Sequence, residues 1–168
     1  MLFLNVLSKL VIMNIHVICV GKIREKYISE GIAEFVKRIQ PYSSLKITEI
    51  PAQDLKHAGF EEKSREIEAQ KILSQIGNNA YVITLEVTGK SLSSEKFAEK
   101  IRDLNNTGIN QIVFIIGGAT GLHHCVSQKA DFRLSLSSMT LPHQLARLFL
   151  LEQIYRSFKI INGEPYHK

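Results

Sequence analysis

Residues 81–85 and 112–116 form two short, almost continuously apolar segments. Strands that are covered on both faces of a parallel sheet have this character, whereas half-exposed strands alternate between apolar and polar residues. Stretches with helical spacing separate these segments from other strand-like runs, an order typical of an α/β domain with a largely parallel sheet. The expected strands cover residues 15–20, 45–50, 81–86, 111–116 and 132–136.

Helical periodicity is expected over four stretches between the strands. They cover residues 28–39, 61–76, a segment that Ser94 can cap, and 122–129. A fifth helix, over residues 143–161, is apolar around most of its circumference. Such a helix is either central to the core or covered by a partner. The pattern therefore leaves two interpretations open, a core helix or a homodimer interface.

Length and composition narrow the class of protein. A chain of 168 residues suits one compact domain, which we place over residues 14–168 after an N-terminal extension (1–13) in which Met13 is an alternative start. The net charge of +5 favours polyanionic partners such as RNA, or serves solubility alone. Two cysteines without metal or redox spacing predict no metal centre and suggest a reducing cytosol. We also expect no membrane span.

Small and glycine-rich residues follow several of the expected strands. One such loop covers residues 135–143, and another contains Gly117, Gly118 and Gly121. A third is expected after Glu86, where residues 89–91 indicate a turn that either lines the same site or is an ordinary connection. Ligands bind outside the carboxyl ends of strands in open α/β sheets, so these loops predict one shared site. The glycine loop lacks a dinucleotide or P-loop fingerprint, and alone it is equally explained by a tight turn.

Polar residues of the last helix and the tail are candidates for chemistry. Glu152 and Arg156 are spaced i,i+4 and can pair. Arg147 in an apolar helix requires an anion, either an RNA phosphate or an acidic side chain in a buried ion pair. The terminal residues 166–168 (Tyr-His-Lys) can stack on a base, move a proton and hold a phosphate, or they are a frayed end.

Taken together in this order, five short motifs resemble one family. They are residues 20–22 (Val-Gly-Lys), 84–86 (Thr-Leu-Glu), 116–122 (Ile-Gly-Gly-x-x-Gly-Leu), 136–143 (Leu-Ser-Ser-Met-Thr-Leu-Pro-His) and 165–168 (Pro-Tyr-His-Lys). Over residues 14–168 the chain resembles the RlmH family of small SPOUT-class RNA methyltransferases. Members of this family methylate N3 of a pseudouridine in large-subunit (23S) ribosomal RNA.

The resemblance implies a SPOUT α/β sheet with a deep C-terminal trefoil knot, a cytoplasmic homodimer that contacts itself through the last helix, and ribosomal RNA as partner. It implies S-adenosylmethionine as cofactor, bound by Leu85, Gly117, Leu136, Ser137, Ser138, Met139, Thr140 and Leu141. For catalysis the candidates are His167, which can assist loss of the N3 proton, Tyr166, Arg156 and Glu152. For RNA contacts they are Arg147, Lys168 and Lys22.

Two other functions stay open at this point. One is a SPOUT methyltransferase that acts on transfer RNA, against which the Pro-Tyr-His tail argues. The other is a non-catalytic assembly factor that binds the ribosome, against which the intact cofactor loops argue. A generic Rossmann-type nucleotide enzyme is a distant third because its glycine fingerprint is absent.

Overall fold

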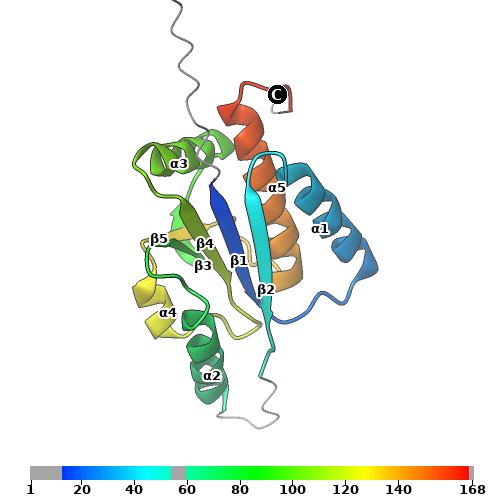
Figure 1. Ribbon diagram of the computed structural model, residues 1–168. Coiled ribbons are helices and arrows are strands. Elements are labelled where there is room, and N and C mark those ends of the chain that lie inside the picture. Colours follow the sequence, from blue (N-terminus) through cyan, green and yellow to red (C-terminus); the bar gives the residue numbers. More distant parts are fainter. Residues whose placement is uncertain (1–12, 54–59, 167–168) are drawn as a thin grey trace, which may run out of the picture.

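The computed structural model describes residues 13–53 and 60–166, which form a five-stranded sheet with helices on both faces (Figure 1). All strand pairs are parallel, in the order β2-β1-β4-β3-β5. The strands are β1 (Asn14–Val20), β2 (Ser44–Ile50), β3 (Tyr81–Ser91), β4 (Gln111–Ile116) and β5 (Phe132–Ser135). The helices are α1 (Lys26–Ile39), α2 (Glu61–Leu73), α3 (Ser94–Asn106), α4 (His124–Lys129) and α5 (His143–Ile161). The prediction of an α/β domain with a parallel sheet is confirmed.

Two hydrophobic clusters lie on the two faces of the sheet. On one face, α1, α3 and α5 cover the strands, and Leu150, Leu151 and Ile154 of α5 are fully buried there. On the other face, α2 and α4 contribute Ile72 and Val126 to a smaller cluster. The central strand β4 is buried from residue 112 to residue 116, as its apolar sequence requires.

The prediction that the third strand ends at Glu86 is wrong. β3 continues to Ser91, and its pairing with β5 shifts so that both Leu85 and Lys90 face Leu134. The intervening residues bulge out of the ladder at the place where a turn was expected. Gly89 permits the return to the sheet, because a Cβ atom there would lie 2.8 Å from the backbone of Arg133.

The helix boundaries follow their capping residues. The N-cap of α3 is Ser93, whose hydroxyl accepts a hydrogen bond from the backbone N–H of Lys96, so the prediction of Ser94 was off by one position. α5 covers the residues expected from its sequence. It runs antiparallel to the strands, beginning near their carboxyl ends and finishing at the opposite end of the molecule (Figure 1).

Met13, the last residue of the expected N-terminal extension, is the first residue that the structure describes. Residues 1–12 of the expected extension lie outside the described residues, whereas the Met13 side chain is buried in the larger core cluster. Its carbonyl accepts a hydrogen bond from the buried hydroxyl of Ser43. Among the described residues, no helix is both long and apolar enough to cross a membrane.

Candidate functional site

A cavity of about 590 Å³ opens at the carboxyl ends of β4 and β5 and at the bulge of β3, beside the start of α5. This volume is within the range of small-molecule sites. Its walls come from segments that are far apart in the sequence: Leu85, Glu86, Val87, Ile116, Gly117, Gly118, Ala119, Gly121, Leu122, Leu134, Leu136, Ser137, Met139, Thr140, Leu141, Pro142, His143 and Ala146. The expectation that strand-ending loops share one site is therefore met by the geometry.

Local hydrogen bonds shape the loop that follows β5. The hydroxyl of Ser135 donates to the carbonyl of Ser137 over 3.0 Å, and the hydroxyl of Ser137 accepts from the N–H of Met139 over 2.9 Å. Such side-chain contacts satisfy backbone groups that no ladder or helix pairs. They hold the loop in a defined turn against the cavity.

The glycine loop after β4 folds back tightly on itself. A Cβ atom on Gly117 would lie 2.9 Å from the backbone of Gly121, which itself adopts a φ of +79°. Side chains at these positions would therefore strain the loop or push it out of place. The sequence leaves this glycine run open as a ligand loop or a tight turn. In the structure it is a tight turn that also forms a wall of the cavity.

The cavity is apolar and carries little positive charge. Among the described residues that line it, none is Lys or Arg. Its one carboxylate, Glu86, accepts a hydrogen bond of 2.7 Å from the hydroxyl of Thr84. Burial, with smaller effects of Arg147 and Arg24, lowers the pKa of His143 below its usual value. The cavity therefore offers one acidic side chain and otherwise uncharged polar groups, which suits a ligand without phosphates.

Most of the predicted cofactor residues line this cavity. Leu85, Gly117, Leu136, Ser137, Met139, Thr140 and Leu141 do so, whereas Ser138 is exposed and is not part of the wall. The prediction did not include Glu86, Leu122, Leu134, His143 or Ala146. The pairing of β5 with β3 places Leu134 beside Leu85, which accounts for its position in the wall. No local sequence pattern marked Ala146 on α5.

Arg147 is not available to RNA in this structure, which corrects its assignment as an RNA contact. Its side chain is 3% exposed, and it donates to Oε1 of Glu49 over 2.6 Å and to the carbonyl of Gly21 over 2.9 Å. The buried ion pair that the sequence left open as the alternative is the observed arrangement. Lys22, the other described candidate for RNA, is exposed.

The catalytic candidates Glu152, Arg156 and Tyr166 lie together, but away from the cavity. Arg156 donates to Oε1 of Glu152 over 2.5 Å and 2.9 Å, and the Tyr166 hydroxyl donates to the same oxygen over 3.2 Å. The guanidinium of Arg156 also lies 4.8 Å from the centre of the Tyr166 ring. Burial, followed by the charge of Glu152, raises the pKa of the Tyr166 hydroxyl. His167 and Lys168 lie outside the described residues.

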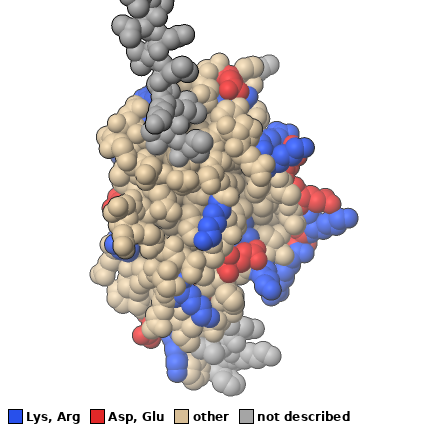
Figure 2. Space-filling view, viewed as in Figure 1, with Lys and Arg blue, Asp and Glu red and all other residues tan. Residues whose placement is uncertain are grey.

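Surface charge does not mark a single binding face in the view of Figure 2, where Lys and Arg side chains alternate with Asp and Glu along the edge formed by α1. Two of the pairs on this helix are Lys26 with Glu30 and Arg38 with Glu34. Exposed pairs of this kind contribute little to stability. The positive net charge therefore gives no position for an RNA contact on this face.

Residues 13–167 match the family described as "Predicted SPOUT methyltransferase". The chain belongs to the SPOUT methyltransferase family. Two relatives named ribosomal RNA large subunit methyltransferase H are 52% identical (Finegoldia magna) and 48% identical (Carboxydothermus hydrogenoformans), and each alignment covers 93% of this chain and 100% of the relative. The resemblance to the RlmH family is thereby confirmed.

A solved structure supports the same fold. It is described as a probable methylase family protein from Haemophilus influenzae, and it superimposes with a TM-score of 0.52 at 14% identity. The match covers 93% of this chain and 71% of that chain. At this identity the likeness concerns the fold alone, and the expected trefoil knot remains a prediction.

Proposed function

We propose that this SPOUT family member transfers a methyl group from S-adenosylmethionine to N3 of a pseudouridine in large-subunit ribosomal RNA. The observation that carries the proposal is the cavity at the carboxyl ends of β4 and β5 and at the bulge of β3, whose residues include most of those expected to bind the cofactor. The names of the relatives support ribosomal RNA as the substrate class. A ribosomal substrate also implies that the protein works in the cytoplasm.

The cavity residues fit this cofactor. Apolar Leu85, Leu136 and Leu141 can enclose an adenine ring, and Gly117 lets its loop fold tightly enough to form the adjoining wall. Glu86 can accept hydrogen bonds from ribose hydroxyls or from an ammonium group. Because S-adenosylmethionine has no phosphate, the absence of Lys and Arg among the described residues of the wall agrees with it. When bound, S-adenosylmethionine supplies an electrophilic methyl group on a sulfonium.

The tail residues supply the second half of the proposed reaction. N3 of the base is an imide that must lose its proton, and His167 is the first candidate for assisting this step because imidazole titrates near neutral pH. Tyr166 can stack on or orient the base, and Lys168 can hold a phosphate. Arg156 and Glu152 position Tyr166 through the contacts described above.

We propose a homodimer because, among the described residues of one subunit, Glu152, Arg156 and Tyr166 do not line the cavity. Arg156 lies more than three helical turns beyond His143, which is about 20 Å along α5 at 1.5 Å per residue. Leu145 and Phe149 are 38% and 43% exposed on the same stripe of α5 as Glu152 and Arg156. A second copy packed antiparallel along this stripe would bring its tail to the cavity of the first. Measuring the molar mass in solution tests this arrangement, and a monomer that retains full activity would contradict it.

The decisive experiment maps modified nucleotides in ribosomal RNA by mass spectrometry, with and without the gene for this protein. The expected result is the loss of one methyl group on one pseudouridine of the large-subunit RNA, and its restoration by the wild-type gene. A methyl group lost from transfer RNA instead would favour another SPOUT activity. Unchanged RNA, together with no binding of S-adenosylmethionine in calorimetry, would favour a non-catalytic assembly factor.

A further inference from the structure

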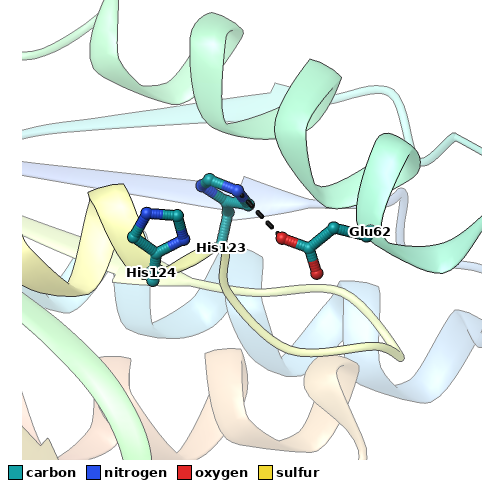
Figure 3. Close-up of side chains that lie close together, drawn as sticks. All are labelled: Glu62, His123 and His124. Carbon is teal, nitrogen blue, oxygen red and sulfur yellow. Dashed lines mark ion pairs between the residues drawn. The ribbon is translucent and has the colours of Figure 1, made fainter.

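Three side chains that the proposed reaction does not use converge on the α2 and α4 side of the sheet. They are Glu62 near the start of α2, His123 just before α4 and His124 at its first residue (Figure 3). Each offers one ligand atom, and the three atoms lie within 4.8 Å of one another. In Figure 3 the two imidazole rings lie side by side, and His123 faces the carboxylate of Glu62.

The distance between two of these atoms is close to that between metal ligands. Nε2 of His123 is 3.0 Å from Oε1 of Glu62. Two donors that share a tetrahedral zinc ion, each at about 2.0–2.1 Å from it, lie roughly 3.3 Å apart. The His124 side chain is exposed, so its rotation can bring the third donor to the same ion without disturbing the core.

We propose that Glu62, His123 and His124 form a binding site for a divalent transition metal ion, for which Zn²⁺ is the representative. Two imidazoles and one carboxylate suit zinc and its neighbours, whereas Mg²⁺ and Ca²⁺ prefer oxygen ligands. Three protein ligands leave one tetrahedral position for water. Glu62 is far from the two histidines in the sequence, which explains why no metal centre was predicted. Two adjacent histidines alone do not have a spacing typical of a metal site.

The surrounding contacts support two of the ligands. The second carboxylate oxygen of Glu62 pairs with Arg65, and Arg65 also donates to the carbonyl of Thr120 over 3.1 Å. Nδ1 of His123 lies 2.9 Å from Sγ of Cys125, and as the N-cap of α4 it also accepts a hydrogen bond of 3.4 Å from the backbone N–H of Cys125. With a metal ion on Nε2, the ring proton occupies Nδ1, so this capping bond would be replaced by donation to the sulfur. Hydrogen bonds to the outer atoms of ligating groups orient them in known metal sites.

A metal ion at this site would affect the wall of the cavity, because the site lies next to it. His123 directly follows Leu122, which lines the cavity, and Arg65 holds the glycine loop at Thr120. A bound ion would therefore fasten the start of α2 to the segment that forms this wall. Because the ion binds only the folded arrangement of these three residues, its binding should raise the melting temperature.

The test is a calorimetric titration of the chelator-treated, full-length protein with ZnCl₂. We expect one ion per chain and a higher melting temperature with zinc. H124A and E62Q should each weaken binding at least tenfold, whereas E61Q, which changes a neighbouring exposed glutamate outside the cluster, should leave it unchanged. His124 and Glu62 are both exposed, so neither substitution is expected to prevent folding; melting without zinc checks this.

Two further measurements distinguish this site from zinc binding by the thiol of Cys125. Co²⁺ in place of zinc should give visible d–d absorption without the near-ultraviolet band of a thiolate ligand, and C125S should retain the affinity. No zinc binding by the wild-type protein, or binding that is unaffected by both H124A and E62Q, would overturn the proposal. Binding that C125S abolishes while H124A leaves it intact would also overturn it, since the ligand would then be a thiol.

Discussion

The two ends of α5 are built differently. At its first turn, the cavity wall is made by backbone loops and apolar side chains that several strands position together. At its far end, Tyr166 is held by Glu152 and Arg156, and Glu164 is held by Tyr42 and Lys159. The first region is fixed by the fold as a whole, whereas the second depends on a few side chains at or near the surface.

This difference suggests a division of labour. A site that encloses a small molecule requires a preformed shape, which a parallel sheet provides at the carboxyl ends of its strands. Residues that approach a large RNA need to adjust, and polar contacts at the surface cost little to rearrange. Changes at the cavity should therefore affect cofactor binding, and changes in the tail should affect methyl transfer.

Removing residues 166–168 should have the largest effect. We expect methylation of the ribosomal substrate to fall at least 100-fold, because general acid–base assistance alone is typically worth about 10²–10⁴-fold. Binding of S-adenosylmethionine, measured by calorimetry, should stay within twofold of wild type. A single H167A variant is the matched test of the imidazole. Full activity of the truncated protein would contradict the proposed separation of cofactor binding at the cavity from methyl transfer at the tail.

Gly117→Ala should give the reverse pattern. The new Cβ atom would lie 2.9 Å from the backbone of Gly121, so the loop must move and the cavity must change shape. We expect the affinity for S-adenosylmethionine to fall at least tenfold, which corresponds to about 1.4 kcal/mol. Gly77→Ala is the control, because its Cβ would meet only the end of the Gln111 side chain. Equal losses in both variants would indicate general destabilisation.

The sequence predicted the fold better than it predicted the contacts. Residues 112–116 and 143–161 have strong patterns, and the structure has β4 and α5 at those places. The end of β3 was missed because its bulge depends on pairing with β5, and Gly89 looked like an ordinary turn. Local patterns carry no information about such long-range pairing.

The candidate site shows the same limit. The cofactor loops were found because parallel strands end at one edge, so their loops meet whatever the details of packing. Arg147 was left with two interpretations because its partner Glu49 lies on β2, 98 positions away in the sequence. Sequence spacing along α5 could show that Arg147 needs an anion, but not which one.

Two arginines of α5 provide a smaller test of the comparison. Arg147→Met should cost about 2–3 kcal/mol of unfolding free energy, because it leaves the buried carbonyl of Gly21 unpaired and removes the partner of Glu49. Arg156→Met, in a more exposed pair, should cost about 1 kcal/mol or less. Urea unfolding followed by circular dichroism measures both. Methyl transfer should fall in Arg156→Met, which removes a contact that positions Tyr166. A loss of RNA affinity in Arg147→Met at full stability would restore Arg147 as an RNA contact.

Acidification should affect the two ends of α5 in different pH ranges. We expect these effects to be smaller than those of the substitutions above. Burial lowers the pKa of His143 in the folded protein, so the unfolded chain binds more protons and stability falls as the pH drops from 6.5 through the lowered value. At the tail, hydrogen bonds from Lys159 and then Tyr42 lower the pKa of Glu164, so that contact is lost only below pH 4.5.

Amide signals in an NMR titration distinguish these two events. Signals of residues 143–146 should shift with a midpoint below pH 6.5, while those of residues 162–164 should stay constant until the pH falls below 4.5. In His143→Asn the first change should disappear and the second should persist. If both regions shifted together above pH 5, the ends of α5 would form one cooperative unit. The tail could then not rearrange toward RNA without also disturbing the cavity.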